Sequence, residues 1–167
     1  HNTLISNGMK IVSKSLSDTE KIAKDFIEKI SMGIYSNALV VGLYGDLGSG
    51  KTTFTQAIAR IFNIEEDVTS PTFVIEKIYP IRTDAASTTS NGTGPLENKK
   101  FRNLIHIDAY RLDSAKELAV LDWDKTTSDS RNIIFIEWPE RVIEVLPENH
   151  AKIFFKFLSE FEREIEI

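Results

Sequence analysis

Cysteine is absent from the 167 residues of this sequence, so the protein has no disulfide framework, as is usual for proteins of the cytoplasm. Also missing are an apolar run long enough to span a membrane and an opening segment with the charged-then-apolar order of a secretory signal. Positive charge is not in excess either, because the formal net charge is -5, which argues against nucleic-acid binding by the bulk of the surface. We therefore expect a cytoplasmic protein that contacts neither membrane nor DNA, and we expect a partner to hold any nucleic acid.

The composition that is present is typical of a globular protein. Hydrophobic residues make up 41% and charged residues 27%, and the length suits one domain with a three-layer core. We assign this domain to residues 9–167 and set residues 1–8, which begin with His, aside as a candidate expression scar. Residues 83–100 consist mainly of small and polar residues, so we interpret them as a flexible insertion between two strands.

The most informative stretch is a phosphate-binding loop pattern, G-x-x-x-x-G-K-T, at residues 45–52. A mostly apolar segment, Ala38 to Tyr44, precedes it as a buried strand would, and an apolar helical face follows it. Strand, loop and helix in this order favour nucleoside triphosphate binding over a glycine-rich turn before an ordinary helix. The helical face consists of Phe54, Ala57, Ile58, Ile61 and Phe62, and the candidate nucleotide contacts are Gly45, Asp46, Leu47, Gly48, Ser49, Gly50, Lys51, Thr52 and Thr53.

Each residue type in this loop has a physical role. Glycines adopt backbone angles closed to other residues and bring N–H groups close to an anion. The following helix directs its free N–H groups and the positive end of its dipole to the same place. Lys51 is expected to neutralise the β- and γ-phosphates, and the Thr52 hydroxyl is expected to bind Mg²⁺.

Two later strands end in a carboxylate, as expected for a magnesium site in a phosphate-loop protein. They are Asn103 to Asp108 and Asn132 to Glu137, and the second is a continuous apolar run typical of a central strand. That run favours Glu137 as the acid beside the loop. The sequence does not decide whether Asp108 or Glu137 touches the metal, or whether Asp108 instead positions the attacking water.

Three further candidates for the nucleotide site carry weaker signals. Thr72, with Thr69 as the alternative, occupies the place where nucleotide switches keep a threonine that faces Mg²⁺ and the γ-phosphate, although a Ser-Pro turn explains the same residues. Trp138 follows Glu137 directly and either packs in the core or lines the site. Arg111 is close enough to the Asp108 strand to stabilise phosphate charge, or forms a surface ion pair.

The remaining segments complete an α/β prediction. We expect a three-layer fold of the P-loop NTPase type, with a mixed, mostly parallel central sheet and an antiparallel C-terminal hairpin. A capping box at Ser17–Glu20 predicts the start of a helix that stops near Gly33. The other expected elements are strands at 9–13 and 73–79, helices at 114–122 and from Pro139, polar turns from 123 to 130, and a hairpin of 151–158 with 161–167.

Four motifs together resemble the TsaE (YjeE) family over about residues 17–158. They are Gly45-Asp-Leu-Gly-Ser-Gly-Lys-Thr-Thr53, Ser70-Pro-Thr-Phe73, His106-Ile-Asp-Ala-Tyr-Arg-Leu112 and Ile136-Glu-Trp-Pro-Glu140. The order and spacing also fit, apart from the insertion at 83–100. Ser49 and Ala109 depart from the family's commoner residues without affecting the expected roles.

The resemblance implies a bacterial ATPase, with ATP and Mg²⁺ as ligands, that is needed to make threonylcarbamoyladenosine in tRNA. It implies two protein partners, TsaD and TsaB, whose complex the ATPase binds and resets between catalytic rounds, so that tRNA is reached only through these partners. The family's metal-binding threonine and glutamate fall on Thr52 and Glu137, and its essential aspartate falls on Asp108. Its switch threonine falls on Thr72, and a threonine near the nucleotide base falls, by a looser alignment, on Thr19.

Two other functions fit a phosphate loop in a chain of this length. A small-molecule kinase usually has an arginine-rich lid, and the insertion at 83–100 contains no arginine. A GTP-dependent switch reads guanine with an N-K-x-D type motif, and Asn98-Lys99-Lys100-Phe101 lacks the aspartate. We therefore expect an ATPase of low intrinsic turnover, since no arginine finger is evident in the sequence.

Overall fold

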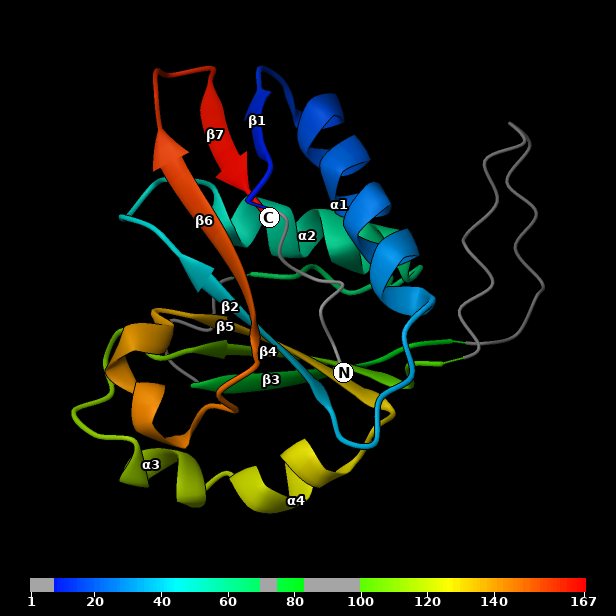
Figure 1. The fold of residues 1–167 in the computed structure, drawn as a ribbon, viewed down its shortest axis with the longest axis vertical. Coiled ribbons are helices and arrows are strands. Elements are labelled where there is room, and N and C mark those ends of the chain that lie inside the picture. The colour runs from blue at the N-terminus through cyan, green and yellow to red at the C-terminus, as the bar shows by residue number, and fades with distance from the viewer. Residues whose placement is uncertain (1–7, 70–74, 83–99) are drawn as a thin grey trace.

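The central feature of the fold is a seven-stranded mixed sheet, seen in a computed structural model that describes residues 8–69, 75–82 and 100–167 (Figure 1). Its strands are β1 (Lys10–Ser13), β2 (Leu39–Tyr44), β3 (Glu76–Pro80), β4 (Asn103–Asp108), β5 (Asn132–Glu137), β6 (Ala151–Phe157) and β7 (Arg163–Glu166). The helices are α1 (Leu16–Ser31), α2 (Lys51–Ile61), α3 (Lys116–Ala119) and α4 (Trp123–Ser128), with two 3-10 helices, η1 (Pro139–Arg141) and η2 (Ile143–Val145). None of the helices in the described part of the chain combines the length and apolar character that a membrane crossing requires.

The strand order confirms the predicted topology. The sheet runs β1-β7-β6-β2-β5-β4-β3, with β6, β2, β5 and β4 parallel to one another and the pairs β1–β7, β7–β6 and β4–β3 antiparallel. Every residue of β5 is buried, as the apolar run predicted, and β5 lies between β2 and β4. Because parallel strands end at one edge, the carboxyl ends of β2, β4 and β5 meet where β2 turns into α2 (Figure 1).

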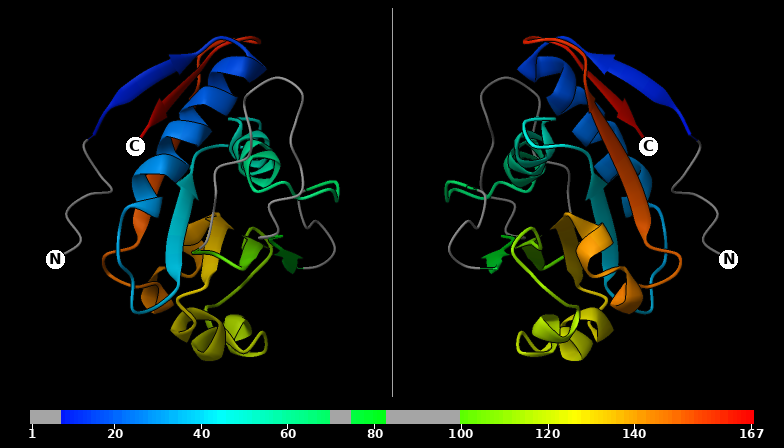
Figure 2. Two further views of the ribbon diagram at one scale, coloured as in Figure 1. Left: turned by 90° about the vertical axis from the view of Figure 1, so that its right-hand side faces the viewer. Right: turned by 90° about the vertical axis from the view of Figure 1, so that its left-hand side faces the viewer.

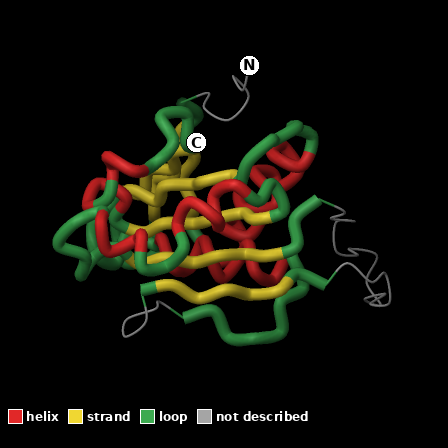
Figure 3. Tube along the Cα trace, turned by 90° about the horizontal axis from the view of Figure 1, so that it is seen from below, coloured by secondary structure: helices red, strands yellow, loops and turns green. Residues whose placement is uncertain are grey.

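Helices cover both faces of the sheet and give the predicted three layers (Figures 2 and 3). On one face, α1 and α2 pack over the inward residues of β2, β5 and β6; on the other, α3, α4 and the 3-10 helices cover β4 and β5. Phe54 of α2 makes edge-to-face contacts with Phe26 of α1 and Phe155 of β6, with ring centroids 6.2 and 5.5 Å apart. This cluster fixes the start of α2, and with it the loop that precedes α2.

Three local predictions were wrong. The helix cap is Ser15, whose side chain accepts a hydrogen bond from the Asp18 N–H at 3.1 Å, so the box at Ser17–Glu20 does not start α1. Asp18 in turn accepts from the Lys14 N–H, which explains why α1 begins before the predicted capping box. The polar segment after Asp122, predicted as turns, forms α4, and the single helix predicted from Pro139 is two 3-10 turns, η1 and η2.

Two predictions lie wholly or partly outside the described residues. The strand expected over 73–79 is seen only as β3, Glu76–Pro80, because residues 70–74 are not described. Most of the insertion predicted at 83–100, and most of the expression scar predicted at 1–8, also fall outside the described ranges.

A Tyr–His pair ties the end of β2 to the start of β6. The Tyr44 hydroxyl lies 2.7 Å from His150 Nε2, and His150 Nδ1 donates to the Pro147 carbonyl oxygen at 2.7 Å. With Nδ1 protonated, a neutral His150 accepts a hydrogen bond from the Tyr44 hydroxyl at Nε2. Burial is the main cause of the lowered pKa of His150, and it favours this neutral form.

We predict that the observed cap, and not the predicted one, stabilises α1. Ser15→Ala should lower the free energy of unfolding by about 1 kcal/mol, because the Asp18 N–H loses its acceptor. The exposed Ser17 makes no such bond, so Ser17→Ala should change stability by less than about 0.5 kcal/mol. Urea unfolding of the nucleotide-free protein measures both, and equal effects would contradict the assigned cap.

We predict an acid-dependent loss of stability that depends on His150. Since the folded protein lowers the pKa of this group, its stabilising contribution is complete above the unfolded pKa of about 6.5 and is lost as the pH falls below it. Unfolding midpoints measured from pH 8 to pH 5 should fall more steeply in the wild type than in His150→Gln. Parallel curves would show that His150 titrates alike in both states.

Candidate active site

The loop between β2 and α2 has the backbone shape of an anion cradle. Gly45 has a φ of 150°, and a Cβ built on it would lie 2.5 Å from the Phe155 carbonyl oxygen, so only glycine fits there. Gly50 caps α2 with a φ of 105° and without a side-chain hydrogen bond to the helix. The free N–H groups of the first turn of α2 are therefore available to an anion, as the sequence predicted.

Lys51 is buried at the centre of this loop. The residue is only 4% exposed. Its Nζ donates to the carbonyl oxygens of Gly45 and Asp46, the second at 2.8 Å. The ammonium also lies 4.5 Å from the centroid of the Trp138 ring. Burial is the largest influence on Lys51 and lowers the pKa of its amine, although nearby carboxylates oppose that shift. A phosphate would therefore offer this cation a better partner than the carbonyl groups do.

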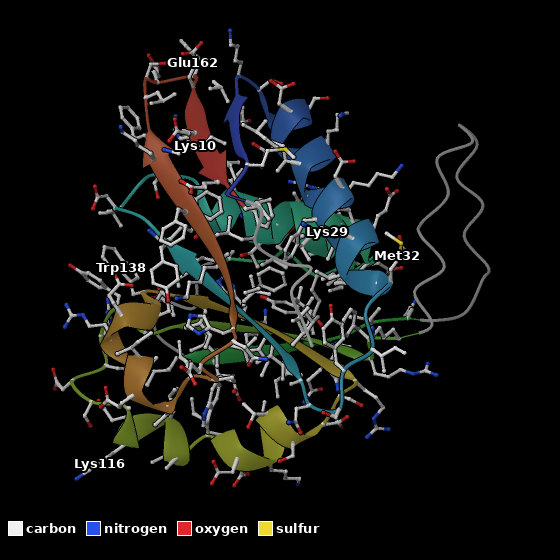
Figure 4. All side chains as sticks on the ribbon, viewed as in Figure 1. Lys10, Lys29, Met32, Lys116, Trp138 and Glu162 are labelled. Carbon is white, nitrogen blue, oxygen red and sulfur yellow. The ribbon has the colours of Figure 1, made fainter. Side chains whose placement is uncertain are left out.

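Trp138 contacts the loop through Lys51 and also packs, partly buried, against the core cluster of β4 and β5. Its φ of 58° is in the left-handed region, which is rare for a bulky residue, and its ring packs 5.0 Å from that of Tyr110. Figure 4 shows Trp138 at the side of the molecule where the β2–α2 loop turns. The strained backbone turns the indole onto Lys51. The sequence did not decide whether Trp138 lines the site, and the structure places it in the cavity wall.

Glu137 is the acid next to the loop. Its Oε1 and Oε2 accept from the Thr52 hydroxyl at 3.0 and 3.3 Å, and Oε2 also lies 2.8 Å from Nε2 of His106. Glu137 is 4% and His106 0% exposed, and His106 Nδ1 has no hydrogen-bond partner among the described residues. Sequence reasoning did not select His106, although His106 and Asp108 share one face of the same strand.

Asp108 lies one strand farther from the loop. It pairs with Glu137 in the parallel register of β4 and β5, and both line the same cavity. Its Oδ1 accepts from the Tyr110 N–H at 3.0 Å, an interaction that orients the carboxylate at the strand end. The structure thus brings both predicted carboxylates to the loop and puts only Glu137 in contact with Thr52.

A cavity of about 480 Å³ extends from Lys51, Asp108 and Glu137 to the start of α1 and the β6–β7 hairpin. Thr19, predicted near the base, is buried in its wall with its hydroxyl 2.7 Å from that of Ser13. Thr72 lies outside the described residues, and Arg111 is not among those that line the cavity. The lining consists of Ser13, Lys14, Ser15, Leu16, Thr19, residues 47–53, Asp108, Glu137, Trp138, Phe155, Glu160, Phe161, Arg163 and Ile165.

The residues at the C-terminal hairpin were missed by sequence reasoning. Glu160, Phe161 and Arg163 reach the cavity because β6 pairs beside β2 and carries β7 past the loop. No local motif marks them, and only the strand order brings them to the loop.

The donors present fit a hard divalent cation. A hydroxyl and a carboxylate in contact are oxygen ligands of the kind that Mg²⁺ prefers. Within the described ranges no three His, Cys, Asp or Glu side chains are grouped to hold a metal by themselves. Thr52 and Glu137 can therefore hold Mg²⁺ only if phosphate oxygens and water complete its shell, as expected beside an anion cradle.

Comparison with known proteins identifies one family. The family model of the threonylcarbamoyl adenosine biosynthesis protein TsaE matches residues 13–165. A Streptomyces coelicolor protein named tRNA threonylcarbamoyladenosine biosynthesis protein TsaE is 38% identical over 115 residues, which are 68% of this chain and 66% of that protein. The Bacillus subtilis protein of the same name is 32% identical over 83% of this chain and 75% of its own length.

The fold is similar to a solved structure. The crystal structure of Bacillus subtilis YdiB superposes with a TM-score of 0.61 and 27% sequence identity, covering 95% of this chain and 82% of that one. The similarity in fold and the similarity in sequence thus extend over the loop, both carboxylates and the C-terminal hairpin.

We predict that His106 stabilises the buried carboxylate of Glu137. His106→Phe keeps a ring of similar size but leaves Oε2 without this partner, and should lower the free energy of unfolding by about 1–3 kcal/mol. In a Glu137→Leu background the same change should cost clearly less, because the carboxylate is gone. Urea unfolding of the four proteins without nucleotide or metal measures this difference, and additive effects would contradict the coupling.

Proposed function

The chain belongs to the TsaE family, whose members act in tRNA threonylcarbamoyladenosine biosynthesis, and from that premise we propose that it is a Mg²⁺-dependent ATPase acting on a TsaB–TsaD complex. The observation that carries the proposal is the contact of Thr52 with Glu137 beside the anion cradle. It supports a site for a nucleoside triphosphate with its cation, since both oxygen ligands are in place before a ligand binds.

Binding of ATP would exchange the internal contacts of Lys51 for phosphate. The amine would leave the carbonyl oxygens of Gly45 and Asp46 and neutralise the β- and γ-phosphates, while the N–H groups of residues 50–53 surround the same oxygens. Trp138 would remain stacked beside the amine and limit the access of water to it.

The hydrolytic step would use the two carboxylates in different roles. Thr52 and Glu137 would hold Mg²⁺, which when bound would stabilise the charge that develops on the phosphate oxygens. The contact of His106 Nε2 with Oε2 of Glu137 keeps this carboxylate oriented. Asp108 lines the same cavity, but the Thr52 hydroxyl bonds to Glu137 instead. We therefore assign Asp108 to orienting the attacking water toward the γ-phosphate.

The nucleoside would extend to the side of the cavity formed by α1 and the hairpin. This side offers apolar surface from Leu16, Phe161 and Ile165 together with the Thr19 and Ser13 hydroxyl groups. A flat base is suited to such a mixture of apolar walls and a few polar atoms.

Protein partners would complete the cycle. The described residues form one sheet with its covering helices and include no separate domain for a second substrate, and the net charge of -5 favours tRNA recognition by TsaD and TsaB rather than by this chain. In this proposal the complex forms in the cytoplasm, where hydrolysis by this chain resets TsaD between rounds of tRNA modification.

The test is ATP hydrolysis by the purified chain, alone and with TsaB and TsaD. Turnover should be slow alone and rise with the pair, and Glu137→Ala should reduce the stimulated rate at least tenfold because a metal ligand is lost. Glu144→Ala, a change in η2 outside the cavity, serves as the matched control and should keep full stimulation. Hydrolysis that is fast alone and unaffected by the pair would contradict the proposal.

A further inference from the structure

Arg163, the first residue of β7, lies against the phosphate loop. A Cβ built on Gly50 would be 3.8 to 3.9 Å from Cγ, Cδ and Nε of this arginine, so the side chain passes directly over the N-cap of α2. Figure 4 labels its neighbour Glu162 at the tip of the β6–β7 hairpin. Arg163 also lines the cavity that contains Lys51 and Thr52.

The guanidinium is fixed in orientation by the hairpin. Nη1 donates to the carbonyl oxygens of Ser159 and Glu162 at 2.6 and 3.0 Å, with Glu160 farther away at 3.4 Å. The guanidinium carbon lies 4.8 Å from the centroid of the Phe157 ring. Since these contacts restrain the plane of the group, little side-chain entropy would be lost when an anion binds to its other edge.

The charge of Arg163 has no acidic partner in the described part of the chain. Arg60, Arg82 and Arg131 each form an ion pair with a carboxylate, at 3.1, 3.4 and 2.8 Å. Arg163 is half-buried and donates only to backbone carbonyls, and only through Nη1, among the described residues. Its Nε and Nη2 groups are thus available for an anion at the N-terminus of α2.

We propose that Arg163 binds the phosphate groups of the nucleotide on the side of Gly50, so that two cations, Lys51 and Arg163, contact the phosphates from different parts of the chain. This inference rests on the proposed function, because it specifies how the same site recognises a nucleoside polyphosphate. The fork of the guanidinium suits two phosphate oxygens, and a lysine at this position would contact them only as a point charge.

The same side chain joins the phosphates to the β6–β7 turn. Nη1 holds the carbonyl oxygens of that turn, which carries Glu160 and Phe161 to the cavity. A phosphate on Nε and Nη2 would therefore restrain the turn, and the turn would be more ordered with ADP or ATP bound than with adenosine.

Calorimetric titrations of three variants with MgATP, MgADP, pyrophosphate and adenosine test the inference. Arg163→Met keeps the stem but removes the charge and should weaken binding of the three phosphate ligands at least tenfold, without weakening adenosine binding. Arg163→Lys should recover part of the affinity. Arg60→Met, which removes an arginine with an exposed ion pair on the same helix as Lys51, should bind all four as the wild type does.

Each outcome decides the inference. Unchanged binding of the phosphate ligands by Arg163→Met would overturn it, as would an equal loss for adenosine together with a lower unfolding midpoint, since Arg163 would then only support the turn. If the wild type binds pyrophosphate but not ATP, and Arg163→Met loses pyrophosphate, the inference stands and the proposed ATPase function fails.

Discussion

The parallel pairing of β2 with β5 is the constraint on which the site depends. The register places Leu43, two residues before the loop begins, opposite Glu137, and so brings the acid within reach of Thr52 at the start of α2. A shift of one residue would turn Glu137 to the other face of the sheet and replace it with an apolar side chain. Ile133 and Phe135 pack in one apolar layer and Ile134 and Ile136 in the other, so a slip of one residue would exchange the two sets and both layers would have to repack.

The site contains charges that the fold buries before any ligand binds. Lys51 is held by backbone carbonyls and an indole ring, and Glu137 is held by a hydroxyl and an imidazole. Each group therefore has weaker partners than a phosphate or a divalent cation would supply, and that difference in partner strength favours ligand binding. The cradle is already formed by its positive-φ glycines, so ligand binding needs rearrangement of side chains more than of backbone.

Much of this arrangement could be predicted from the sequence, because strong local patterns determine it. The phosphate loop has its own spacing, and the run Ile133 to Ile136 marks a central strand that ends at Glu137, so both partners of the key contact were identified. The helix cap was misplaced because two serines lie near the start of α1, and only backbone geometry selects Ser15 over Ser17.

The position of Arg163 beside the loop could not be predicted from local sequence patterns. It is more than 100 residues from the loop in the chain, and a single arginine within an alternating hairpin has no signature of its own. Its position follows from β6 pairing with β2 and β7 folding back over the loop, which are long-range contacts. His106 was missed for a different reason: its contact with Glu137 depends on the pairing of β4 with β5, which no local pattern around His106 shows.

The central claim is that Thr52 and Glu137 form one half of a metal site that a nucleotide completes. Mn²⁺, a spectroscopic substitute for Mg²⁺, tests it when free Mn²⁺ is followed by electron paramagnetic resonance with and without ATP, each compared with the same solution lacking protein, because ATP itself binds Mn²⁺. The account predicts one tightly bound Mn²⁺ per chain only when ATP is present, weakened at least tenfold by Glu137→Gln and unchanged by Asp129→Asn, a half-buried acid outside the cavity. Equal Mn²⁺ binding by the wild type and Glu137→Gln in the presence of ATP would contradict it.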